Sequence, residues 1–170
     1  MPRRRVEIDI APALRAELPR TWLRSVALRA LDVAAPGRSL TLSLAIVDDE
    51  TIRDLNRRYR GLDEVTDVLS FSPKHPGPWA GESPPAPSSN GVEPFVLPPD
   101  EGELLGEVVV AYPQAARQSQ AAGHSVQEEL ALLIVHGVLH LAGHDHAEPS
   151  EEAAMRALER LALALIPPVS

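Results

Sequence analysis

Residues 130–146 read LALLIVHGVLHLAGHDH, and this stretch governs the interpretation of the whole chain. It begins with six apolar residues and continues into a segment of eleven residues that holds four of the protein's six histidines. His136 and His140 are four residues apart, so on a helix their imidazoles project from one face, one turn apart. Gly143 allows the backbone to leave the helix, after which His146 can approach the same point from another direction. The spacing predicts a metal site formed by His136, His140 and His146.

Three neutral imidazoles are a ligand set that suits zinc, and a tetrahedral ion with three protein ligands keeps one position open. An open position is typical of catalytic zinc, which lowers the pKa of bound water to about 7 and polarises a carbonyl or phosphoryl oxygen. Histidines packed in a core are the alternative. Burying several imidazoles beside an apolar helix without a ligand would cost kilocalories each in desolvation. We therefore expect one Zn²⁺ ion as the cofactor.

The length and composition favour one domain over residues 1–170, because a chain of this size can bury a full core without disulfides. The sequence contains no cysteine, which excludes thiolate metal sites, disulfides and thiol nucleophiles. The N-terminal residues alternate apolar and acidic side chains from Val6 to Ile10, unlike the continuous apolar stretch of a signal peptide. We expect a cytoplasmic protein with no membrane partner.

The formal net charge of -8 is unevenly distributed along the chain. Residues 1–80 hold 13 Lys and Arg against 11 Asp and Glu, whereas residues 81–170 hold 3 against 13. The basic half contains a local cluster that could contact phosphate even in an acidic protein. A solvated helix face is an equally good explanation of the cluster as a whole. Its members are Arg53, Arg57, Arg58 and Arg60.

Apolar periodicity predicts an α+β fold in which a four-stranded, mostly parallel or mixed sheet carries about five helices. Predicted strands cover residues 6–11, 39–47, 65–71 and 105–112. Predicted helices cover residues 19 to about 36, 51 to about 59, 113–122, 126–141 and 151–166. Asp48 or Asp49 is placed to cap the second helix, and Ser125 with Glu128 matches a capping box for the fourth.

Residues 72–102 differ from the rest, because they hold nine of the 17 prolines and show little apolar periodicity. Such a segment is too long for an ordinary connection, so we interpret it as a mobile insertion within the single domain. Trp79 and Phe95 in this insertion could stack on the bases of single-stranded RNA, although such residues more often only anchor a loop.

Two reactions are compatible with an open zinc site. The pattern His-x3-His-x5-His with its glycine is that of the metzincin proteases, whose metal helix carries a glutamate general base directly after the first histidine. Gly137 occupies that position here, so a metzincin-like zinc peptidase is the second hypothesis. Phosphodiester cleavage needs an arginine for the non-bridging oxygens, and in RNA the substrate's own 2′-hydroxyl can attack.

Three blocks of sequence resemble the YbeY endoribonuclease family, a family of bacterial rRNA maturation factors. The first block is HGVLHLAGHDH at residues 136–146, and the second is LNRRYRGLDEVTDVLSF at residues 55–71. The third is LGEVV at residues 105–109, which is similar to the strand that follows in the family. The family usually has tyrosine where this chain has His144.

The resemblance implies a zinc-dependent, single-strand-specific endoribonuclease that acts in small-subunit rRNA 3′-end maturation and ribosome quality control. It implies that His136, His140 and His146 are the zinc ligands and that Arg60 is the functional arginine facing the site. It also implies ribosomal RNA and the small ribosomal subunit as partners. A non-catalytic ribosome-assembly factor with structural zinc is the third hypothesis. Asp145 could orient a zinc ligand or be an ordinary turn residue.

Overall fold

The computed structural model describes residues 3–16, 18–72, 103–142, 149–164 and 166. Within these ranges no helix is both long enough and apolar enough to cross a membrane. Most of the predicted proline-rich insertion, with Trp79 and Phe95, lies outside the described residues.

The elements, in chain order, are β1 (Arg4–Ile10), the 3-10 helix η1 (Pro12–Leu14), α1 (Arg20–Ala34), β2 (Leu40–Val47), α2 (Asp49–Arg60), β3 (Val68–Phe71), β4 (Glu103–Ala111), α3 (Tyr112–Ala122), α4 (Val126–Leu141) and α5 (Pro149–Ala164).

The four strands form one mixed sheet in the order β1-β2-β4-β3. β2 pairs in parallel with β1 and β4, whereas β3 pairs antiparallel with β4. This arrangement confirms the predicted α+β fold, with its four-stranded sheet and five α-helices. The third strand is shorter than predicted and begins only at Val68, whose amide donates to the carboxylate of Asp67 at 2.8 Å. The short helix η1 was not predicted.

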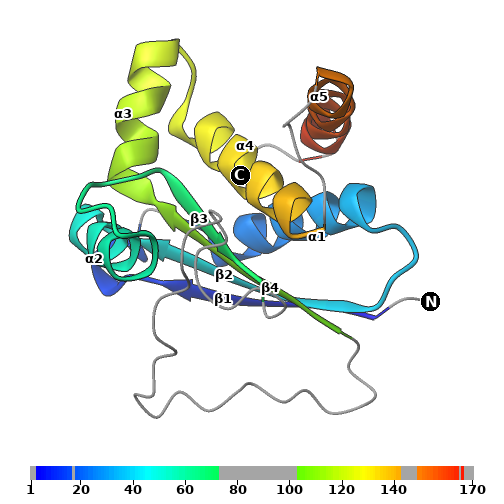
Figure 1. Ribbon diagram of the computed structural model, residues 1–170, viewed down its shortest axis with the longest axis horizontal. Coiled ribbons are helices and arrows are strands. Elements are labelled where there is room, and N and C mark those ends of the chain that lie inside the picture. Colours follow the sequence, from blue (N-terminus) through cyan, green and yellow to red (C-terminus); the bar gives the residue numbers. More distant parts are fainter. Residues whose placement is uncertain (1–2, 17, 73–102, 143–148, 165, 167–170) are drawn as a thin grey trace.

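The sheet separates two apolar cores. Helices α1 and α4 cover one face, α5 packs against both of them from outside, and α2 covers the other face (Figure 1). Along β4, Val108 and Val110 join the larger core, whereas Val109 and Ala111 join the smaller core with Ile52 of α2. The period of two along a strand therefore places α2 and α4 on opposite faces.

Gly106 allows β4 to follow its neighbours through an irregular register. Leu104 pairs with Thr41 and Gly106 with Leu42, so β4 carries one extra residue at a β-bulge. Gly106 has a φ of +148°, and a Cβ atom there would lie 2.4 Å from the carbonyl oxygen of Phe71. Only glycine fits both the bulge and the close approach of β3.

Candidate metal centre

Helix α4, which carries His136 and His140, is packed tightly against the sheet. Ser125 caps its N-terminus by accepting from the amide of Glu128 at 3.1 Å, as the sequence predicts. At Gly137 a Cβ atom would lie 2.8 Å from Cγ1 of Val108, so the missing side chain allows the helix to approach β4. The Ser70 hydroxyl of β3 donates to the Gly137 carbonyl at 3.4 Å. The backbone that carries the histidines is therefore held against two strands.

His136 and His140 face one another on a partly exposed side of α4. Their Nε2 atoms lie 3.1 Å apart, and their rings are 4.6 Å apart at an interplanar angle of 73°. Both residues are partly exposed, and the side chain of His136 keeps 33% of its surface accessible. The one-turn spacing has thus brought two ring nitrogens to a common point at the protein surface.

Glu159 of α5 orients one of these imidazoles. Its Oε1 atom lies 2.8 Å from Nδ1 of His136, and its side chain is only 15% exposed. A carboxylate at this distance favours the tautomer in which Nδ1 carries the proton, which leaves the lone pair of Nε2 available. The arrangement matches the carboxylate–histidine pairing that supports many metal ligands.

Glu159 was not among the predicted site residues, although a signal for it was present. Met155 and Ala162 are buried on the inner stripe of α5, and Glu159 lies between them at helical spacing. A carboxylate on an otherwise apolar stripe needs a partner, and His136 is that partner. Asp145, the residue predicted as a candidate for such a role, lies outside the described residues.

The geometry of the two described histidines fits zinc. Two nitrogens bound at about 2.05 Å to a tetrahedral zinc ion lie about 3.3 Å apart, close to the observed 3.1 Å between the Nε2 atoms. The third predicted ligand, His146, lies outside the described residues together with Gly143 and His144. Accordingly, the described part of the chain contains no cluster of three metal-ligating side chains.

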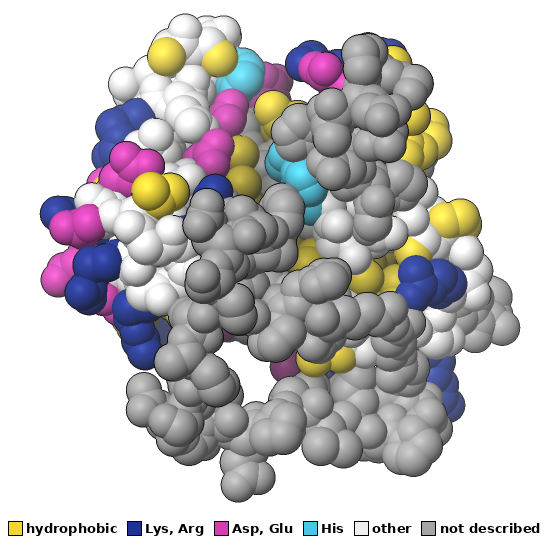
Figure 2. Space-filling view, viewed as in Figure 1, with side chains coloured by type: hydrophobic (Ala, Val, Ile, Leu, Met, Phe, Trp, Pro, Cys, Tyr) yellow, Lys and Arg dark blue, Asp and Glu magenta, His cyan; other side chains and the backbone are white. Residues whose placement is uncertain are grey.

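An open groove of about 470 Å³ leads away from His136 between α3, α4 and α5. Its wall includes the apolar side chains of Leu133 and Met155 and the carboxylate of Glu129. Glu129 is buried and lies 2.6 Å from Nε2 of His124. Figure 2 shows histidine side chains on this face of the molecule with acidic side chains nearby. The groove is large enough for a small organic group next to the candidate metal centre.

The helices that carry Arg60 and the histidines, α2 and α4, pack on opposite faces of the sheet. Arg60 is the last residue of α2 and is exposed, and among the described residues no hydrogen bond or ion pair joins it to His136 or His140. Strand β3 lies between the two groups. Its Phe71 ring packs edge-on against Tyr59 at 5.3 Å, whereas the adjacent Ser70 contacts α4.

The other arginines of the α2 cluster are held by neighbouring groups. Arg53 forms an ion pair with Asp63 that raises the arginine's pKa, chiefly through their hydrogen bond. Arg57 and Arg58 both pair with Asp54, at 2.5 and 3.7 Å. The cluster is therefore partly neutralised by a carboxylate of its own helix and by one that follows the helix, which leaves Arg60 as the better candidate for an external anion.

The sequence profile described as Endoribonuclease YbeY matches residues 12–166. The chain belongs to the YbeY endoribonuclease family. A relative named Endoribonuclease YbeY from Dehalococcoides mccartyi strain CBDB1 is 43% identical over 158 residues, covering 93% of this chain and 90% of that protein. Another of the same name, from Halalkalibacterium halodurans, is 47% identical over 114 residues, covering 67% of this chain and 64% of that one.

The solution structure of TM1509 from Thermotoga maritima has a similar fold. Its TM-score with this chain is 0.55 at 18% sequence identity, and the match covers 96% of this chain and 88% of that one. At this identity the likeness supports the fold alone. The YbeY family match over residues 12–166 extends across all the described helices.

Proposed function

We propose that this protein is a metal-dependent endoribonuclease, a hydrolase that cleaves phosphodiester bonds in single-stranded RNA. The observation that carries the proposal is the pair of Nε2 atoms 3.1 Å apart on α4, in a chain that belongs to the YbeY endoribonuclease family. The support from Glu159 adds to it, because an imidazole locked in one tautomer is prepared for a ligand at its other nitrogen.

One zinc ion is the proposed cofactor, held by His136, His140 and His146. The donor set consists of nitrogens, and the separation of the two described nitrogens suits a tetrahedral ion. When bound, zinc supplies a Lewis acid that polarises a phosphoryl oxygen. The chain's own contribution is to fix the ligands. The capped helix α4 sets the separation of His136 and His140, and Glu159 sets the orientation of one ring.

Arg60 is the proposed catalytic residue on the protein side. Its guanidinium can donate two parallel hydrogen bonds to the non-bridging oxygens of a phosphate and so stabilise the charge that develops there. Helix α2 ends at Arg60, because Gly61 adopts the left-handed conformation with a φ of +73°. This end of α2 lies beside β3, because Tyr59 packs against Phe71, and β3 also contacts α4 through Ser70.

The structure favours the nuclease over the two other hypotheses, a metzincin-like peptidase and an assembly factor with structural zinc. A metzincin-like peptidase would need a glutamate directly after the first histidine, and Gly137 is packed there against Val108 and cannot accept a longer side chain. A purely structural zinc does not account for the partial exposure of His136 or for the groove beside it. RNA remains the substrate that the family points to.

The biological substrate that we propose is ribosomal RNA, cut during 3′-end maturation and quality control of the small ribosomal subunit in the cytoplasm. The support is the family membership of the chain together with the three blocks of sequence at residues 55–71, 105–109 and 136–146. The small subunit is then the proposed partner.

The proposed activity is tested with metal-replete protein and single-stranded RNA. We expect wild-type protein to cleave, His140→Ala to lose nearly all cleavage, and His124→Gln to retain it. The control histidine lies near the other end of α4, where the glutamine can still donate to Glu129. Equal cleavage by wild type and His140→Ala would show that a contaminating nuclease is responsible. Cleavage of peptides but not of RNA would favour the peptidase.

A further inference from the structure

Strand β1 forms one edge of the sheet, and its outward carbonyl groups can be assigned from its pairing. The carbonyl of Arg3 accepts from the amide of Leu40 at 2.9 Å, so it faces β2. Because carbonyl direction alternates along a strand, the carbonyls of Val6, Ile8 and Ile10 face the open edge. β1 has no strand neighbour on that side among the described residues (Figure 1).

Each of these three carbonyls accepts a hydrogen bond from an arginine that reaches around the edge. We call these residues the arginine row. Because α1 runs antiparallel to β1 and two of the arginines are one helical turn apart, the row follows the strand in reverse order. The bonds run from Arg24 Nη1 to Val6 O at 3.0 Å, from Arg20 Nη1 to Ile8 O at 2.6 Å and from Arg15 Nε to Ile10 O at 3.1 Å.

The arginine row keeps most of its donors for another partner. A guanidinium has five N–H donors, and each member is bound here to one backbone carbonyl. All three residues are exposed, and none forms an ion pair with a carboxylate in the described part of the chain. The carbonyls repeat every second residue, so the anchored charges follow one another at about 6.6 Å along the edge.

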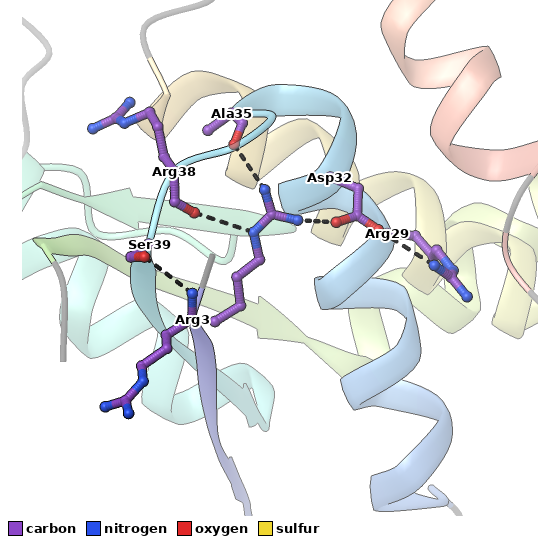
Figure 3. A network of polar contacts seen from close by, with 7 residues as sticks. Arg3, Arg29, Asp32, Ala35, Arg38 and Ser39 are labelled. Atoms are coloured by element: carbon purple, nitrogen blue, oxygen red, sulfur yellow. Dashed lines mark hydrogen bonds and ion pairs between the residues drawn. The ribbon is translucent and has the colours of Figure 1, made fainter. Parts of the chain in front are cut away.

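Arginines elsewhere on α1 and β1 are arranged differently. Arg29 is paired with Asp32 at 3.3 Å, and the guanidinium of Arg4, whose side chain is only 10% exposed, contacts the same carboxylate. Figure 3 shows the carbonyl groups of Ala35 and Arg38 directed at that guanidinium as well. These groups hold the end of α1 to the strand, whereas the arginine row presents positive charge to solvent.

We propose that the arginine row is a binding surface for the phosphate backbone of single-stranded RNA, separate from the candidate metal centre. The identity of the polyanion as RNA rests on the proposed function. A line of guanidiniums with fixed orientation can contact successive phosphates without reading the bases. The row lies at the β1 edge, opposite the β3 edge, so it would hold a part of the RNA away from the scissile bond. It also gives an acidic protein a local site for a polyanion.

The competing role for the arginine row is to cover the sheet edge against pairing with another strand. The two roles predict different results. Edge protection requires the hydrogen bonds to the carbonyls and predicts no change in RNA affinity, whereas RNA binding requires the positive charge and predicts a change in the salt dependence of binding.

The test measures the binding of a labelled single-stranded RNA by fluorescence anisotropy over a range of salt concentrations. All proteins carry His140→Ala, so that the RNA is not cut and binding is measured independently of cleavage. The variant Arg20→Gln/Arg24→Gln is compared with Arg29→Gln/Arg117→Gln. The control pair also removes two positive charges, but these arginines are already paired with Asp32 and Asp49.

A plot of log K against log salt has a negative slope, and we expect the row variant to reduce the magnitude of this slope by about 1.4, that is about 0.7 for each phosphate that the variant no longer binds, and the control to leave it unchanged. Equal slopes for the two variants would overturn the proposal.

A second measurement, chemical modification of arginine, needs no substitution in the row. RNA should protect Arg15, Arg20 and Arg24 from phenylglyoxal while Arg29 and Arg117 stay reactive, and equal reactivity with and without RNA would also overturn it. If RNA binds in this way but wild-type protein cleaves no RNA, only the proposed catalytic function fails.

Discussion

The Nδ1 atom of His136 lies 2.8 Å from Oε1 of Glu159, so a carboxylate on α5 holds a proposed metal ligand on α4. The two residues come from helices that pack against each other over the larger core. Because Glu159 is mostly buried, its carboxylate is kept close to the imidazole and has little freedom to turn to solvent. The position of α5 therefore controls the orientation of a side chain on α4.

Replacing Glu159 by glutamine should weaken zinc binding by about 10- to 100-fold. Glutamine keeps the size of the side chain but removes the negative charge that favours a protonated Nδ1. The affinity is measured by competition with a chromogenic chelator, and cleavage of RNA should fall at limiting zinc. Glu152→Gln is the control, because Glu152 lies on the same helix and pairs with Arg156. Unchanged zinc affinity in Glu159→Gln would contradict this positioning role.

Replacing Arg60 by alanine should lower kcat for RNA cleavage by about 100-fold or more, with zinc affinity unchanged. The side chain is exposed at the end of α2, so the melting temperature should change little. Arg60→Lys should recover part of the loss, since lysine keeps the charge without the bidentate geometry. Arg53→Ala serves as the matched control from the same helix. An Arg60→Ala protein with wild-type kcat would remove Arg60 from the proposed mechanism.

The features that local sequence determines were predictable. A capping serine and a run of apolar residues indicate a helix at residues 126–141, and the four-residue spacing then places His136 and His140 on one face. The sequence also placed the N-cap of α2 at Asp48 or Asp49, and the structure has it at Asp48. These features depend on contacts within a few residues along the chain.

The features that the sequence left open depend on how distant elements pack. Glu159 is 23 residues from its partner His136, and their contact exists only because α5 docks on α4. The bonds from Arg20 and Arg24 to β1 require the antiparallel placement of α1 along the sheet edge. At the start of β3, the Asp67 side chain accepts from Gln118 of α3, which is 51 residues away. The spacing of apolar residues along the sequence cannot predict any of these contacts.

Replacing Gly137 by alanine should destabilise the fold by about 1–3 kcal/mol, despite the better helix propensity of alanine. The new Cβ atom would lie 2.8 Å from Cγ1 of Val108 and 3.2 Å from the hydroxyl of Ser70, so α4 would have to move away from the strands. Denaturant unfolding measures the loss. The double variant Val108→Ala/Gly137→Ala should be more stable than the sum of the single effects predicts, because the smaller residue makes room. Strict additivity would show that steric contact with Val108 is not the cause.

Replacing Asp48 by alanine should destabilise the protein by about 1 kcal/mol at neutral pH, through loss of the α2 cap. The Thr51 hydroxyl and then the Thr51 amide donate to the Asp48 carboxylate and hold its pKa below the usual value, with the amide at 2.8 Å. A lowered pKa in the folded state means that the ionised carboxylate contributes stability above the unfolded-state pKa of about 4, and that this contribution is lost as the pH falls through the folded-state value.

The stability difference between wild type and Asp48→Ala should therefore be constant near neutral pH and shrink below about pH 4. Asp48→Asn is the matched control, because asparagine caps helices about as well as aspartate but does not titrate in this range. Denaturant unfolding at a series of pH values gives the three curves. If the difference between wild type and Asp48→Ala were the same at pH 7 and at pH 3, the ionised form of Asp48 would not be the species that stabilises α2.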